Sequence, residues 1–154
     1  MVTELMEGVY WVGIVDWGLR KFHGHELSTH RGSTYNSYLI RDEKTVLVDT
    51  AWAPFKEEWL ENIRAVVDPA EIDIIVANHA EPDHSGGLPL IMQHAPNAEL
   101  VVSKRGAESI EGIYHRPWKF RTVGTGDRIP IGKSELVFIE AAMLHWPDSM
   151  FTYL

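Results

Sequence analysis

Residues 72–87, IDIIVANHAEPDHSGG, join an apolar run to a cluster of polar side chains. Residues 72–77 are almost continuously apolar, which predicts a strand that is buried on both faces. The polar segment 79–87 follows directly, and α/β folds usually place their functional sites in loops at the carboxyl ends of strands. We therefore expect an α/β fold that carries its chemistry in this loop.

Strand and helix patterns alternate through the rest of the chain. Residues 35–41 and 45–50 are two apolar runs separated by three polar residues, which is the spacing of a β-hairpin. Further strands are expected at residues 8–15, 100–103, 120–123, 135–140 and 150–154, helices at 54–67, 88–94 and 106–114, and a long irregular loop at 16–34. Because hairpins occur among the alternating elements, a layered α/β architecture with mixed sheets is favoured over a purely parallel sheet.

The composition indicates one globular domain without cysteine. The 154 residues are 45% hydrophobic and 23% charged, and a chain of this length can bury a sizeable core. The absence of cysteine excludes disulfides, iron–sulfur clusters and thiol nucleophiles, so any metal must be held by His, Asp or Glu. A net charge of −8 argues against a nucleic-acid partner. No apolar run suits a bilayer and no signal-peptide pattern begins the chain, which predicts a cytoplasmic protein without a membrane partner.

Four potential metal ligands lie within six positions of the polar segment: His79, Glu81, Asp83 and His84. If the backbone stays extended, alternation sends His79, Glu81 and Asp83 to one side, and His84 could turn toward the same centre. The alternative is a solvated loop in which Asp83 or Ser85 caps a helix. Four ligand side chains in one short loop, directly after a buried strand, favour the metal site.

The ligand types favour a pair of iron or manganese ions over zinc. A nitrogen-rich loop of the form His-x-His-x-Asp-His would suit zinc, but Glu81 stands where that pattern has its second histidine. Two carboxylates also offset part of the charge of two divalent cations in a poorly solvated site. His145, after the expected strand at residues 135–140, is a further candidate ligand, although a lone histidine at a strand end is more often structural.

At these residues the chain resembles the flavodiiron proteins. The resemblance rests on HAEPDHSGG at residues 79–87 and MLHWPDSM at residues 143–150. Asp16-Trp17, FHG at residues 22–24 and GSTYNSYL at residues 32–39 are also similar, so that essentially the whole chain is covered. The resemblance implies a metallo-β-lactamase-like fold, an αββα sandwich with mixed sheets. Glu81 is specific within that fold, because most of its hydrolases have histidine there, and the His145 motif is more specific still.

The resemblance implies a role for each candidate ligand. His79, Glu81 and His145 would bind one iron, and Asp83 and His84 would bind the other. In the family, a bridging aspartate and one more histidine complete the site, and both follow the His145 motif at positions beyond Leu154. Residues 1–154 would then be the N-terminal part of a diiron domain, an incomplete copy of the sandwich, and the flavodoxin-like FMN domain is absent from this chain.

The implied reaction is the reduction of dioxygen to water or of nitric oxide to nitrous oxide. The implied cofactors are two iron ions and FMN, with the FMN contributed by a flavodoxin-like domain of a neighbouring protomer. The resemblance also implies a rubredoxin-type electron donor and a homodimer or homotetramer. His23 and Trp146 would line the metal pocket or face the flavin, with packing as the alternative for both. Dioxygen and nitric oxide are both small and neutral, so these residues do not distinguish them.

Two other functions stay open at the level of the sequence. One is a zinc-dependent hydrolase of the same fold, such as a thioesterase or lactonase, in which the metal would lower the pKa of a bound water to about 7. Glu81 argues against it. The other is an inactive fragment or split half that acts as an assembly module. Because the implied bridging carboxylate lies outside the chain, we expect the isolated polypeptide to be poorly active.

Overall fold

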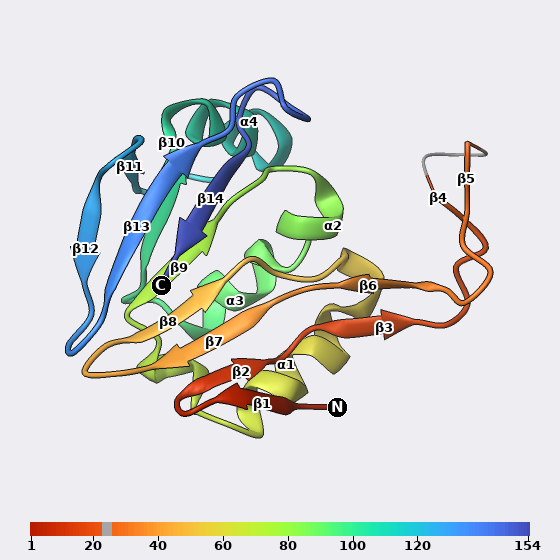
Figure 1. The fold of residues 1–154 in the computed structure, drawn as a ribbon, viewed down its shortest axis with the longest axis horizontal. Helices are drawn as coiled ribbons and strands as arrows, with labels where there is room; N and C mark the ends of the chain where they lie inside the picture. Colours follow the sequence, from red (N-terminus) through yellow and green to blue (C-terminus); the bar gives the residue numbers. More distant parts are fainter. Residues whose placement is uncertain (23–25) are drawn as a thin grey trace.

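The computed structural model describes residues 1–22 and 26–154. Its largest unit is a seven-stranded sheet with the strand order β1-β2-β7-β8-β9-β10-β11 (Figure 1). The strands are β1 (Thr3–Met6), β2 (Val9–Trp11), β7 (Tyr38–Arg41), β8 (Thr45–Val48), β9 (Ile74–Ala77), β10 (Glu99–Ser103) and β11 (Phe120–Val123). The first four pair antiparallel, whereas β8, β9, β10 and β11 run parallel to one another.

The parallel half of this sheet decides where a site can form. β7 and β8 form the predicted hairpin, with Leu39 opposite Leu47. β8, β9 and β10 then run side by side in the same direction. The carboxyl ends of parallel strands meet at one edge of a sheet. The residues that follow β8 and β9, beginning with Asp49 and Asn78, therefore emerge next to each other.

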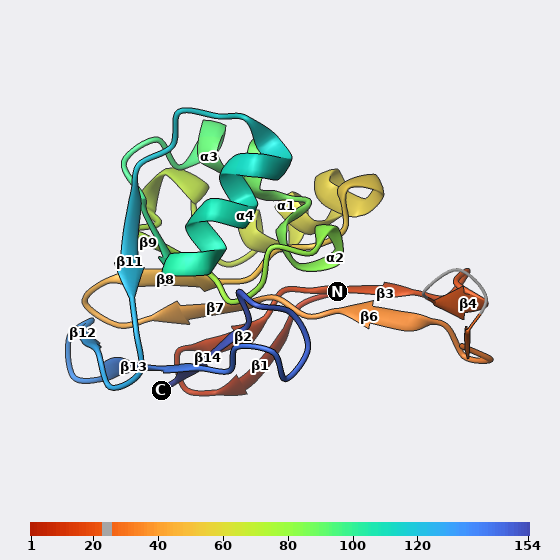
Figure 2. The same ribbon diagram turned by 90° about the horizontal axis from the view of Figure 1, so that it is seen from above.

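A second sheet and a layer of helices cover the two faces of the large sheet (Figure 2). The second sheet is antiparallel and has the order β12 (Arg128–Pro130), β13 (Glu135–Glu140) and β14 (Met150–Tyr153). The helices are α1 (Lys56–Arg64), α2 (Pro82–Ser85), α3 (Leu88–His94) and α4 (Lys104–Tyr114), with short 3-10 turns η1 (Ala53–Phe55) and η2 (Pro69–Glu71). The described residues thus form three layers, helix, sheet and sheet, of the expected αββα sandwich.

The core consists of two apolar clusters, one on each face of the large sheet. On the helix side, Ile75 of β9 belongs to a cluster with Trp59 and Leu60 of α1. On the other side, Val76 belongs to a cluster with Leu136 and Phe138 of β13. All four residues of β9 are buried. The prediction of a strand buried on both faces is therefore confirmed, and the following loop starts from a rigid position.

The expected single strand at residues 8–15 is wrong, because the chain breaks between β2 and β3 (Ile14–Asp16). A side chain at Gly13 would meet the carbonyl oxygen of Tyr35 and the ring of Trp11. The buried Asn62 of α1 donates hydrogen bonds to the carbonyl oxygens of Val12 and Gly13, at 3.3 and 3.0 Å. A side chain from a distant helix thus satisfies the backbone where the strand stops.

The expected irregular loop at residues 16–34 is also wrong in part. Its described residues contain the ladder of β4 (Lys21–Phe22) with β5 (Leu27–Ser28), and β6 (Ser33–Tyr35) pairs with β3. These strands are two or three residues long, so their alternation is too short to be recognised. Among the residues that the structure describes, no helix is both long and apolar enough to cross a bilayer.

Candidate metal centre

The polar segment after β9 begins extended and then turns into helix α2. Glu81 precedes the helix with φ −57° and ψ 141°, and Pro82 occupies its first turn, where its missing N–H costs nothing. The buried hydroxyl of Ser85 donates to the carbonyl oxygen of Ala80 at 2.6 Å, which ties the helix to the preceding loop. The backbone is therefore not extended as far as Asp83, contrary to our simplest expectation, and that residue reaches the site from a helical turn.

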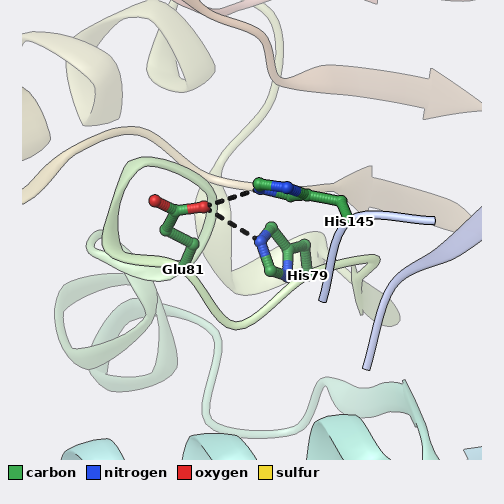
Figure 3. Close-up of side chains that lie close together, drawn as sticks. All are labelled: His79, Glu81 and His145. Atoms are coloured by element: carbon green, nitrogen blue, oxygen red, sulfur yellow. Dashed lines mark hydrogen bonds and ion pairs between the residues drawn. The ribbon is translucent and has the colours of Figure 1, made fainter. Parts of the chain in front are cut away.

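Three of the five sequence-predicted ligands come together (Figure 3). Oε2 of Glu81 lies 3.1 Å from Nε2 of His79 and 3.1 Å from Nε2 of His145. One ligand atom from each of the three residues lies within 4.8 Å of the others. They are the one such group of three found in the described part of the chain. A carboxylate between two imidazole nitrogens is a suitable donor set for one metal ion.

His145 reaches this point from the loop between β13 and β14, far away in the sequence. The backbone N–H of Met150 donates to the carbonyl oxygen of Asn78 at 3.0 Å, directly before His79. The loop is closed on itself by a hydrogen bond from the N–H of Ala141 to the carbonyl oxygen of Ser149. The start of β14 is therefore fastened beside the end of β9, which brings the His145 loop over the site.

Asp83 and His84 form a second pair beside the first group. Oδ2 of Asp83 lies 3.7 Å from Nε2 of His84. The other ring nitrogen of His84, Nδ1, lies 3.2 Å from Oδ2 of Asp49, whose Oδ1 accepts from the N–H of Asn78 at 2.7 Å. The rings of His79 and His84 are 5.2 Å apart. The structure therefore places these two predicted ligands next to the first three, as a separate pair.

Hydrogen bonding favours the ligand form of the carboxylate. Burial raises the pKa of Glu81, but hydrogen bonds with His145 and His79 outweigh burial, so the pKa of Glu81 lies below its usual value. Burial lowers the pKa of His84, while the hydrogen bond with Asp49 and the nearby acidic charges raise it by more, for a net increase. In both cases an imidazole and a carboxylate stabilise each other's charged forms.

The donor set and its unpaired atoms fit a cation. Ligand atoms that share one first-row ion at bond lengths of about 2.1 Å lie roughly 3 Å apart, close to the two 3.1 Å distances of Glu81. Oδ1 of Asp83 is buried and has no hydrogen-bond partner in the described structure. A buried carboxylate oxygen without a partner carries an energetic cost that a metal bond would remove. The residues present therefore fit one ion at the first group and a second beside Asp83.

Sequence reasoning missed two aspartates on the far sides of the histidines. Asp49 faces His84, and Asp148 lies 3.0 Å from Nδ1 of His79. Asp49 directly follows β8, which runs parallel to β9. Its position at the carboxyl end of that strand was the one feature of the sequence that could have indicated its place beside the site. Asp148 lies within the His145 motif, but no role was expected for it. Its burial, at 1% exposure, is a property of the folded chain.

The two side chains predicted to contact the pocket or a flavin have different outcomes. Trp146 packs edge-on against His79, with ring centroids 4.9 Å apart, and is 36% exposed. It therefore lies against a candidate ligand and leaves part of its ring at the surface. His23 lies outside the described residues.

A cavity of about 290 Å³ opens beside Glu81 and Asp83. Leu19, Tyr35 and Trp52 contribute to its wall. The hydroxyl of Tyr35 donates to Oδ2 of Asp16 at 3.0 Å. Burial and this hydrogen bond raise the pKa of Tyr35 far above its usual value, so the phenol stays neutral. The cavity thus combines apolar side chains and the cation Lys21 with the two carboxylates.

A family model described as ODP family beta lactamase matches residues 34–154, which include all five candidate ligands. The chain belongs to this family. The nitric oxide reductase of Moorella thermoacetica is 50% identical to this ODP-family chain over 153 residues, which are 99% of the chain and 38% of that protein.

Solved structures give the same relationship. Rubredoxin oxygen:oxidoreductase from Desulfovibrio gigas is 39% identical, with a TM-score of 0.95, over 100% of this chain and 38% of that one. The flavodiiron protein from Giardia intestinalis is 42% identical, with a TM-score of 0.93, over 99% of this chain and 37% of that one. The predicted metallo-β-lactamase-like fold and the resemblance to flavodiiron proteins are confirmed. This ODP-family chain spans a little under two fifths of these relatives.

Proposed function

We propose that this chain is the diiron-binding part of an oxidoreductase that reduces dioxygen to water, nitric oxide to nitrous oxide, or both. The observation that carries the proposal is the carboxylate of Glu81 placed 3.1 Å from both His79 and His145. A mixed nitrogen and oxygen set with this carboxylate favours iron over the nitrogen-rich sites that suit zinc. The names of the relatives, which include a nitric oxide reductase and an oxygen:oxidoreductase, support the reaction class.

The proposed ligand assignment divides the five residues as the structure groups them. His79, Glu81 and His145 hold one iron, and Asp83 with His84 holds part of the coordination of the other. In this proposal residues 1–154 are the N-terminal part of the diiron domain. A bridging aspartate and a further histidine are contributed by sequence that follows the His145 motif. The short coverage of the relatives supports this domain assignment.

When bound, the two iron ions would supply two electrons and adjacent coordination positions for a small diatomic molecule. The chain's own residues supply the environment. Leu19, Tyr35 and Trp52 give the approach apolar surface, which admits a neutral gas, and Lys21 adds a positive charge to the same wall. The hydroxyl of Tyr35 donates its hydrogen bond to Asp16, and its pKa is raised. The phenol therefore stays protonated and adds no charge to the wall.

The electron balance requires an electron source besides the two iron ions. Two molecules of nitric oxide, two electrons and two protons give nitrous oxide and water, whereas dioxygen needs four electrons and four protons to give two waters. We propose that FMN delivers these electrons from a flavodoxin-like domain of a neighbouring protomer, in a homodimer or homotetramer. A rubredoxin-type protein is the proposed donor to FMN, which the names of the Desulfovibrio and Vibrio vulnificus relatives support. Trp146, partly exposed beside His79, is the proposed side chain facing the flavin.

The test begins with the metal content of the natural polypeptide that contains these residues, purified without added metal. We expect about two iron ions per chain, and consumption of dioxygen or nitric oxide when a reduced electron donor is supplied. Glu81→Gln should lower both the iron content and the gas consumption, whereas Glu108→Gln, on the exposed face of α4, should change neither. Zinc without iron, together with hydrolysis of a thioester or lactone, would overturn the proposal.

A further inference from the structure

The side of His79 that faces away from Glu81 is occupied by a fully buried carboxylate. Oδ2 of Asp148 lies 3.0 Å from Nδ1 of His79 and accepts a 2.6 Å hydrogen bond from the N–H of Ala80. The side chain of Asp148 has 0% exposure. Its other oxygen, Oδ1, has no hydrogen-bond partner among the described residues. All of the described polar contacts of this carboxylate therefore go through one oxygen, toward the candidate ligand loop.

This contact determines which ring nitrogen of His79 carries the proton. A carboxylate oxygen accepts, so the nitrogen facing it must donate. The backbone N–H of Ala80 is always a donor and already points at the same oxygen. With Nδ1 protonated, Nε2 of His79 can offer its lone pair to an ion bound between it and Oε2 of Glu81, which lies 3.1 Å away. The opposite tautomer would place two lone pairs against each other at Asp148 and a proton at the metal.

The backbone of Asp148 is held independently of His79. The hydroxyl of Ser103, at the end of β10, donates to the carbonyl oxygen of Asp148 at 2.8 Å. The same hydroxyl caps α4 by accepting from the N–H of Gly106 at 2.9 Å. Asp148 is therefore fixed by the third parallel strand and by a helix N-terminus. It also follows His145 by three residues, so one loop supplies both a ligand and the carboxylate behind another ligand.

We propose that Asp148 is a positioning residue that holds His79 as the Nδ1–H tautomer and increases the basicity of Nε2 toward the metal. This inference rests on the proposed metal site and adds to it a residue that binds no ion. Carboxylates behind metal-binding histidines commonly orient the ring, and their loss costs about 10- to 100-fold in metal affinity. The edge-on contact of Trp146 with the ring of His79 limits its rotation from another side.

The first experiment measures the tautomer directly. Ring ¹⁵N chemical shifts of His79 are recorded in the natural polypeptide loaded with diamagnetic zinc. We expect protonated Nδ1 and unprotonated Nε2 in the parent, and a mixture of tautomers in Asp148→Asn. A parent protein with its proton on Nε2 would overturn the proposal. Because this readout needs neither iron nor turnover, it stands even if the proposed reaction is wrong.

The second experiment measures how firmly the metal is held. Asp148→Asn keeps the shape of the side chain and should release the ion found in the purified polypeptide to a chelator about 10- to 100-fold faster than the parent. The matched control, Asp127→Asn, changes an aspartate that accepts from Gly124 in an exposed turn and should release it at the parental rate. If both variants release the ion at the same rate while Asp148→Asn remains folded by circular dichroism, Asp148 does not position His79 and has only a packing role. If Asp148→Asn does not fold, the tautomer of the parent decides.

Discussion

The two ends of strand β8 carry aspartates with opposite environments. Asp42, in the hairpin before the strand, is only partly buried, and it accepts hydrogen bonds from the backbone N–H groups of Glu43, Lys133 and Ser134. Asp49, directly after the strand, is 8% exposed and uses one oxygen for a backbone N–H and the other for the imidazole of His84. An aspartate therefore joins two turns at one end of β8, and another aspartate faces a candidate ligand at the other end.

The difference lies in how the carboxylate oxygens are used. At the Asp42 end, both oxygens are satisfied by backbone donors of the turns. At the other end, Oδ1 of Asp83 and Oδ1 of Asp148 are buried without a hydrogen-bond partner in the described structure. Such buried oxygens lower the free energy of unfolding and are uncommon in folded proteins. A carboxylate whose oxygens both accept hydrogen bonds from turns has a structural role. Buried carboxylate oxygens without hydrogen-bond donors, beside imidazoles, indicate a site that binds a ligand.

The largest effect that should separate the two ends is the loss of metal on His79→Ala. Removing a ligand costs more than removing the carboxylate that orients it, so we expect metal affinity to fall by more than about 100-fold. Iron per polypeptide after dialysis against a chelator measures this. His94→Ala, at the end of α3, is the control and should retain iron. Retention of iron by His79→Ala would remove this residue from the ligand set.

The next effect concerns the backbone beneath α2. A Cβ at Gly86 would lie 2.5 Å from the carbonyl oxygen of Pro82 and 2.6 Å from the backbone nitrogen of Ala53, neither of which can move freely. Gly86→Ala should lower the free energy of unfolding by about 3 kcal/mol and reduce the iron content, because α2 carries Asp83 and His84. Urea denaturation measures the first and metal analysis the second.

The control for this change is Gly112→Ala in α4, where nothing lies within 4 Å of the added Cβ. Alanine is favoured over glycine in a helix interior, so this variant should raise the free energy of unfolding by about 0.5–1 kcal/mol. Parental stability in Gly86→Ala would show that α2 can shift to admit a methyl group. The second ligand pair would then be less rigidly placed than the contacts indicate.

How much could be predicted from the sequence differs between the two ends. Long, strongly patterned elements were placed well: α3 and β13 have the expected bounds, and β9 has the expected burial. The ligands of the site were visible because they lie together in one short segment. His145 was found through its motif, since about sixty intervening residues hide its proximity to Glu81 until the fold brings them to 3.1 Å.

What the sequence could not show was set by contacts between distant segments. Asp49 and Asp148 are ordinary aspartates in the sequence, and their role depends on which imidazole the fold brings opposite them. Helix α2 was missed because its four residues are too few for a periodic pattern. The hydrogen bonds of Asp42 with the turn at residues 133–134 join segments about ninety positions apart, which no local pattern indicates.

A smaller effect is expected on stability alone, at the Asp42 end. Gly132 has φ +137°, and a Cβ there would collide with Oδ1 of Asp42. Gly132→Ala should lower the free energy of unfolding by about 2 kcal/mol, part from the backbone and part from the lost hydrogen bonds of Asp42. Gly126→Ala has φ +91° but open space around the added Cβ, and should cost only about 1 kcal/mol. Both variants should keep the parental iron content. Iron loss in Gly132→Ala would show that the Asp42 end of β8 affects metal binding at the Asp49 end.

The smallest effect is the pH dependence contributed by Asp42. Its hydrogen bonds from Lys133, Ser134 and Glu43 together outweigh the effect of burial and lower the pKa of the carboxyl in the folded state. A lowered folded pKa means that this contribution to stability is present above the unfolded pKa of about 3.9 and is lost as the pH falls through the folded value. Asp42→Asn should therefore be less stable than the parent at neutral pH and converge with it in acid.

The control for that titration is Glu43→Gln, which removes a neighbouring negative charge without removing the acceptor of the three backbone hydrogen bonds. Because Asp42 is only partly buried, salt weakens the charge part of its contribution, so the difference should shrink at high ionic strength. Denaturation midpoints measured from about pH 7 to about pH 2, at low and high salt, test both points. The stability difference between Asp42→Asn and the parent could instead persist unchanged into acid. That result would mean that the carboxamide accepts the backbone hydrogen bonds with poorer geometry and that the charge of Asp42 contributes nothing.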